Sequence, residues 1–211
     1  MKLKINIPEK LGDIPLRNYQ SFLGVENPTE KDFLKHFYGI NNLVEVKQKD
    51  VAELVNAVNK CFDNKPKKLI KTFTLNGIEY GFIPKLDDIS YGENLDLTEY
   101  INKPETLHKA MAVLYRPITK KQFNKYLIEP YEGSQKFSAL FKQMPLDVVF
   151  SAQVFFYNLT NELLNCTPAF LKEESQQISA ESGENMQRYI NSLMENLRKL
   201  NELRLTTSMR L

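Results

Sequence analysis

The sequence contains few of the residues that most often build metal centres, disulfide frameworks and phosphate-binding loops. Its 211 residues include 2 Cys, 2 His, 8 Gly and no Trp. Cys61 and Cys166 lie far apart and outside any C-x-x-C pair, so we expect two unpaired thiols and no zinc site. No glycines have the spacing of a dinucleotide-binding fingerprint or a P-loop. We therefore expect no metal and no cofactor.

Long apolar runs and a strong charge bias are also missing. The N-terminal MKLKINIPEK lacks the apolar region of a signal peptide. The longest apolar run, VVFSAQVFFYNL at 148–159, is shorter than the ~20 residues of a bilayer span. With 28 basic and 26 acidic residues, the net charge of +2 argues against a nucleic-acid-coating protein. We expect a chain without a membrane span that stays in a reducing cytoplasm.

Helical periodicity and capping signals recur along the chain. Apolar residues at helical spacing predict helices over 16–23, 49–62, 104–115 and about 145–165, the last of them central because it is apolar around much of its circumference. Thr29 with Asp32, and Ser90 with Glu93, match the capping box that opens a helix. Gly39 is placed to end the helix that starts at Thr29.

One hairpin is predicted over 69–83. Two strand-like runs flank Asn76-Gly77, the pair favoured in a type I′ turn because both positions need positive φ. Residues 2–6 alternate polar and apolar and predict a short strand that joins this hairpin in a small sheet. Residues 116–132 are predicted to form a long basic connection that contains a short extended piece, YLIEPY.

These elements predict a mainly α-helical α+β protein. A globular domain over 1–171 carries the 69–83 hairpin, a polar linker covers 172–185, and an amphipathic helix covers 186–205. In that helix an a/d heptad seam offers a partner-binding surface, made of Met186, Ile190, Leu193, Leu197 and Leu200. Because the seam lasts about two heptads, docking on its own domain and docking on a partner both stay open.

The segment HKAMAVLYRPI, 108–118, is the strongest candidate for chemistry. His108 as a base and Arg116 as an anion clamp would be a functional interpretation. The alternative places His108 near the start of a helix and Arg116 in its last turn, where a cation suits the helix dipole before Pro117 ends the helix. We favour the structural interpretation and expect no catalytic residues and no enzymatic activity.

Two neighbouring segments carry opposite charge. Residues 109–126 contain five basic residues and no acid, whereas residues 84–101 contain five acids and one lysine. We expect a charge patch of Arg116, Lys120, Lys121 and Lys125, which pairs either within the molecule or with neighbouring copies. Phe123 and Tyr126 interleave with these lysines, so a nucleic-acid contact remains an alternative.

Four blocks of the sequence resemble a family of tailed-bacteriophage proteins. They are YGFIPKLDDISYGENLDL (80–97), HKAMAVLYRPI (108–118), YLIEPYEG (ending at Gly133) and MPLDVVFSAQVFFYNLTNELL (144–164). The family comprises roughly 200-residue proteins of Bacteroidetes phages, including crAss-like phages, without an assigned enzymatic activity, so no catalytic residue is carried over. The resemblance covers about 70–164 well, the N-terminal third loosely, and neither 172–185 nor 186–205.

The resemblance implies a structural or assembly role among other phage structural proteins or copies of this chain. The implied place is the host cytoplasm during assembly or the virion itself, as a head–tail connector, tail or packaged cargo protein. A tail assembly chaperone absent from the mature virion, or a phage nucleic-acid-binding accessory protein, are the alternatives.

Overall fold

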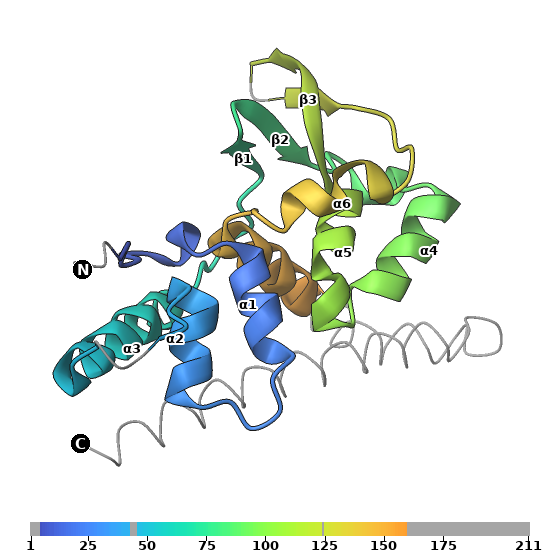
Figure 1. The fold of residues 1–211 in the computed structure, drawn as a ribbon. Coiled ribbons are helices and arrows are strands. Elements are labelled where there is room, and N and C mark those ends of the chain that lie inside the picture. Colours follow the sequence, from blue (N-terminus) through green and yellow to red (C-terminus); the bar gives the residue numbers. More distant parts are fainter. Residues whose placement is uncertain (1–4, 43–45, 124, 160–211) are drawn as a thin grey trace, which may run out of the picture.

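The computed structural model describes residues 5–42, 46–123 and 125–159. The protein is α+β and mainly helical, as predicted, and Figure 1 shows how its elements are arranged. The α-helices and strands are α1 (Leu16–Leu23), α2 (Glu30–Tyr38), α3 (Gln48–Asp63), β1 (Thr72–Leu75), β2 (Ile78–Phe82), α4 (Tyr91–Tyr100), α5 (Leu107–Leu114), β3 (Tyr115–Gln122), β4 (Lys125–Ile128) and α6 (Gln135–Phe141). Three short 3-10 turns, η1 (Leu11–Asp13), η2 (Leu86–Asp88) and η3 (Pro104–Thr106), accompany them.

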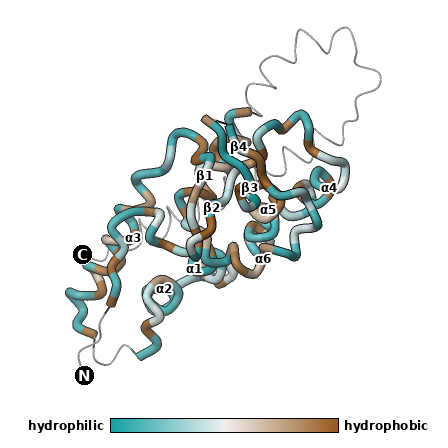
Figure 2. Tube along the Cα trace, turned by 90° about the horizontal axis from the view of Figure 1, so that it is seen from above, coloured by the Kyte–Doolittle hydropathy of each residue, from teal (hydrophilic) through white to brown (hydrophobic). Residues whose placement is uncertain are grey.

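A further helix over 146–159 lies at the centre of the molecule, as its apolar sequence predicts. It separates α1–α3 on one side from the sheet, α4, α5 and α6 on the other (Figure 1). Phe150 packs edge-on against Tyr19 of α1, with ring centroids 5.2 Å apart. Phe155 packs against Phe82 of β2, with centroids 5.7 Å apart. This one helix therefore joins both sides in one hydrophobic core, and the apolar stretches in Figure 2 gather around the same elements.

The predicted helix signals hold where the structure describes them. Thr29 accepts from the backbone N–H of Asp32 while the Asp32 carboxylate accepts from the N–H of Thr29, which satisfies two free donors at the start of α2. Ser90 and Glu93 form the same reciprocal cap at the start of α4. Gly39 ends α2 with φ 71°, in the left-handed region that glycine adopts without strain.

The sheet is larger than the sequence indicates. It is a four-stranded antiparallel meander in the order β1-β2-β3-β4. The first hairpin is confirmed: Asn76 and Gly77 have φ 51° and 79°, as a type I′ turn requires. The other two strands come from 115–128. The short extended piece predicted at YLIEPY overlaps β4, whereas the prediction of a connection over the stretch that forms β3 is wrong.

The missed strand has a physical explanation. Pro117 disfavours helix in the residue before it, and the extended backbone that follows suits a strand as well as a loop. The carbonyl of Pro117 accepts a hydrogen bond from the N–H of Glu129 at 2.9 Å, so the two strands pair although proline has no backbone N–H to donate. The stretch from Thr119 to Gln122 is exposed, so it lacks the apolar alternation that identifies a half-buried strand.

Other predictions concern the ends of the chain. The expected strand over 2–6 is not present at Ile5 and Asn6, the two of its residues that are described, and the remaining three lie outside the described residues. The linker over 172–185 and the helix over 186–205, including all five seam residues, also lie outside them.

Candidate interaction surfaces

His108 has a structural environment in the first turn of α5. Its side chain is buried, and its Nδ1 lies 3.1 Å from Nε2 of Gln20, which also donates to the carbonyl of Pro104 at 2.5 Å. Gln20 therefore ties α1 to the start of α5, with the imidazole as one acceptor. Burial lowers the pKa of His108, and the charges of Lys142 and Lys109 lower it further, so the ring is neutral at neutral pH.

Arg116 forms a buried ion pair instead of part of an exposed patch. Its Nη1 lies 2.7 Å from Oε1 of Glu93, and the two side chains are only 9% and 7% exposed. The prediction that Arg116 belongs to the same surface as the three lysines is therefore wrong. Since helix α5 ends at Leu114, Arg116 lies in β3 and not in the last helical turn.

The carboxylate of Glu93 links the cap of α4 to the sheet. One of its oxygens accepts from the N–H of Ser90 at 2.8 Å, while the other faces Arg116. Burial alone would raise the pKa of Glu93, but the hydrogen bonds from Ser90 and the charge of Arg116 outweigh it, so the pKa is lowered. The ring of Tyr131 covers the guanidinium, 5.6 Å from its carbon, and the Tyr131 hydroxyl donates to Asp96.

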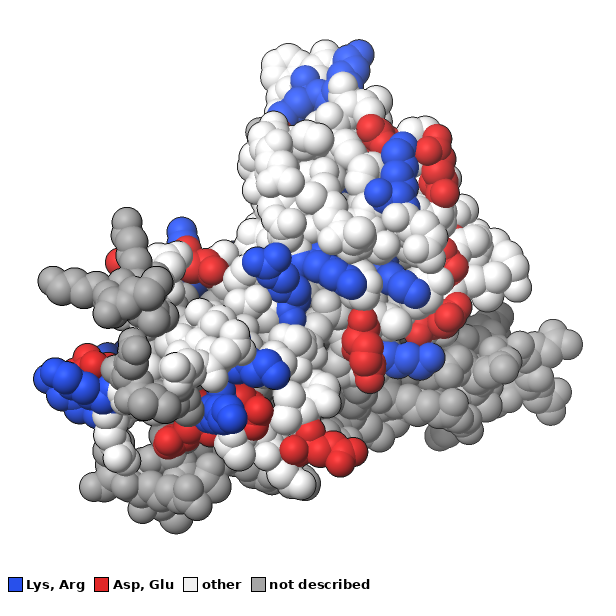
Figure 3. Space-filling model, viewed as in Figure 1, with Lys and Arg blue, Asp and Glu red and all other residues white. Residues whose placement is uncertain are grey.

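The far end of the sheet exposes apolar and basic side chains together. We call this surface the sheet tip and define it as Ile78, Lys120, Phe123, Lys125 and Leu127. Phe123, in the β3–β4 turn, has φ 51° and is 94% exposed, while Leu127 is 60% and Ile78 48% exposed. In Figure 3 basic side chains mark this upper end of the molecule.

The strand register places most of the sheet tip on one face. Lys120 pairs with Leu127, and both Lys125 and Leu127 point away from the side of Tyr126 because strand side chains alternate. A bulge between Ile118 and Lys120 sets this arrangement. The opposite face is closed by internal contacts, since the Tyr126 ring lies against Gly81 and its hydroxyl donates to the carbonyl of Phe82 at 2.9 Å.

Lys121 is separated from the other two lysines. It lies on the closed face and pairs with Glu79 at 2.6 Å. Within the described residues, Lys120 and Lys125 make no ion pair. Two of the four residues of the predicted charge patch are therefore available to a partner.

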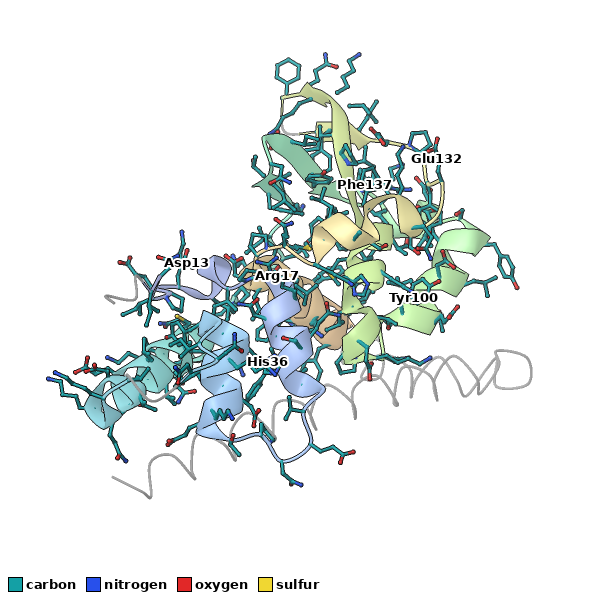
Figure 4. The ribbon with its side chains drawn as sticks, viewed as in Figure 1. Asp13, Arg17, His36, Tyr100, Glu132 and Phe137 are labelled. Carbon is teal, nitrogen blue, oxygen red and sulfur yellow. The ribbon has the colours of Figure 1, made fainter. Side chains whose placement is uncertain are left out.

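A second exposed surface lies on α4 and the turn before it. We call it the α4 face and define it as Asp87, Asp88, Tyr91, Leu95 and Glu99. Tyr91 is 78% and Leu95 52% exposed, and spacings of four residues place Tyr91, Leu95 and Glu99 on one side of the helix. The opposite side of α4 contributes Leu97 to the core, and Tyr100 lies 5.0 Å from the ammonium of Lys109 (Figure 4).

The sequence contained part of the signal for these surfaces. Tyr91 and Leu95 stand four residues apart in an acidic helix, a pattern that could have indicated an exposed apolar pair. The two oppositely charged segments do pair within the molecule, through Arg116 and Glu93. Most of their remaining charges lie on the sheet tip and the α4 face.

The described residues contain no group of three or more His, Cys, Asp and Glu that could hold a metal ion. None of the helices in that part of the chain combines the length and apolar character of a membrane span. Comparison with protein-family models, curated proteins and solved structures finds no match to this chain.

Proposed function

We propose that this chain is a non-enzymatic bacteriophage structural or assembly protein that acts through protein–protein contacts. The resemblance of four sequence blocks to tailed-phage proteins supports the phage context. One structural observation supports the mode of action: five of the six large hydrophobic side chains exposed in the described residues lie on the sheet tip and the α4 face. Exposed apolar residues beside charged ones are typical of protein interaction surfaces.

The contacts of the two side chains that were considered for catalysis also support this proposal. His108 accepts from Gln20, and Arg116 neutralises Glu93 next to a helix cap. Each group holds two segments of the fold together. Such buried polar contacts stabilise and specify a fold.

Mass spectrometry of purified phage particles tests the proposal. A virion component, such as a connector, tail or packaged cargo protein, should be present at a fixed ratio to the major structural proteins. A tail assembly chaperone should be absent from particles and present in assembly intermediates. Absence from both would contradict the proposal.

A nucleic-acid-binding accessory function is the second candidate. Its support is Phe123, an exposed ring that a base could stack on, between Lys120 and Lys125. Such binding should weaken steeply with salt and should be lost when both lysines become glutamate. Binding to single-stranded DNA that ignores salt and survives the lysine variant would eliminate this candidate.

A further inference from the structure

We propose that the sheet tip of one copy docks on the α4 face of a second copy, which gives head-to-tail self-association. This inference rests on the proposed assembly function and names the partner of the two surfaces. The occupant of the sheet tip is the segment 87–99 of another molecule of the same chain.

The charges of the two surfaces are complementary. The sheet tip offers the ammonium groups of Lys120 and Lys125, with no carboxylate among its five residues. The α4 face offers the carboxylates of Asp87, Asp88 and Glu99. Of these three, only Asp88 has a described ion-pair partner, Lys85 at 3.3 Å, and that pair is highly exposed. Opposite patches of this kind set the register and speed of association.

The apolar side chains are also matched. The sheet tip has Phe123, Leu127 and Ile78, and the α4 face has Tyr91 and Leu95. Two side chains four residues apart on a helix lie side by side, so one aromatic ring can pack against both of them. We place the ring of Phe123 against Tyr91 and Leu95 because this ring is almost fully exposed. An aromatic pair such as Phe123 with Tyr91 is favourable beyond the area that it buries.

The two surfaces lie on different parts of the molecule. The sheet tip is at the upper end of the sheet, whereas α4 lies beside α5 at the opposite end of β3 (Figure 1). The Arg116–Glu93 pair joins the base of β3 to α4, so the tip points away from the α4 face. A copy whose tip is engaged therefore keeps its own α4 face free. Contacts between two different patches generate rings or filaments.

Sedimentation velocity of the full-length chain tests the inference. At about 50 mM salt the chain should associate as its concentration rises to about 100 µM, and about 500 mM salt should weaken the association. The tip variant Lys120→Glu/Lys125→Glu and the α4 variant Asp88→Lys/Glu99→Lys should each raise the dissociation constant roughly tenfold or more. The control Lys67→Glu/Lys68→Glu makes the tip variant's charge change on exposed lysines elsewhere, and should associate like the unchanged chain.

A mixture of the two interface variants gives the decisive result. Each variant keeps one intact surface, and the two reversed surfaces, with glutamates on one variant and lysines on the other, are again opposite in charge. An equimolar mixture should therefore associate, through heterodimers that can grow further, although neither variant associates alone. Heterodimers can form only if both variants fold, which excludes misfolding as the cause of their lost self-association. No symmetric interface between like patches predicts this behaviour.

Three results would overturn the inference. One is a full-length chain that stays monomeric at about 100 µM in low salt. Another is association that survives in both variants, as expected if the seam in 186–205 carries it. The third is a monomer that binds single-stranded DNA through Lys120 and Lys125. The proposed function fails separately, through absence of the chain from particles and assembly intermediates.

Discussion

Replacement of Arg116 with methionine tests whether this cation stabilises the fold or contacts a partner. Methionine keeps much of the side-chain volume and removes the charge. The Glu93 carboxylate would stay buried, with only the hydrogen bonds from Ser90 to stabilise its charge among the contacts described above. Removal of one partner from a buried ion pair costs about 3–5 kcal/mol, because the other charge is left uncompensated. We expect a loss of this size in the free energy of unfolding.

A double-mutant cycle isolates the interaction between the two side chains. Glu93→Gln removes the charge but keeps an acceptor for the N–H of Ser90, since glutamine also serves in a capping box. The double variant Glu93→Gln/Arg116→Met should lose less stability than the sum of the single losses. We expect the shortfall to be about 0.5–3 kcal/mol, the range for residues in direct contact.

Urea unfolding followed by far-UV circular dichroism measures these energies. The chain has no tryptophan, so tryptophan fluorescence cannot serve as the probe. Because the Glu93 pKa is lowered in the folded state, its contribution is present above the ordinary carboxyl range and lost as pH falls through the folded-state pKa. The cost of Arg116→Met should therefore shrink in acid. A cost below about 0.5 kcal/mol with no coupling would refute the reasoning, and Arg116 would then be an exposed cation.

Three further predictions follow from single contacts. Because burial lowers the pKa of His108, the unfolded state binds more protons below about pH 6.5, so acid destabilises the fold by up to about 1.4 kcal/mol per pH unit. Chemical denaturation across pH should show this slope reduced in His108→Asn. Gly81→Ala should lower the free energy of unfolding by about 1–3 kcal/mol, because the added Cβ would lie 2.5 Å from the Tyr126 ring. Gly92→Ala, in open space on α4, should not lower it. Equal thermal shifts for the two glycine variants would contradict this. Cys61 is buried and its thiol pKa is raised, so disulfide reagents should modify it only on unfolding; fast labelling of native Cys166→Ser protein would contradict its burial.

The sequence predicted the caps and turns whose conformation depends on residues close together in the chain. Two capping boxes, the left-handed Gly39 and the Asn76-Gly77 turn each depend on residues within four positions of one another. The central helix was predictable because its apolar residues cover most of its circumference. In each case the favoured conformation of the segment agrees with the fold around it.

Contacts between distant segments were not predictable from these patterns. The partners Arg116 and Glu93 lie on different elements, and no spacing rule connects a strand residue with a helix cap. In the β3–β4 hairpin only a short extended piece overlapping β4 was predicted, and β3 escaped prediction because its distal half is exposed and lacks apolar alternation. The same exposure makes that hairpin a candidate for contact with a partner.

The most direct test is a cross-linking measurement that identifies the nearest neighbour of Phe123 in the associated state. The position tolerates a photoreactive analogue, p-benzoylphenylalanine, because the native ring is 94% exposed. Irradiation of the purified full-length chain, followed by peptide mass spectrometry, identifies the residues that the ring touches. We predict intermolecular cross-links to the segment around Tyr91 and Leu95 of a second copy. Cross-links confined to other segments, or none between copies at concentrations where the chain associates, would contradict the account.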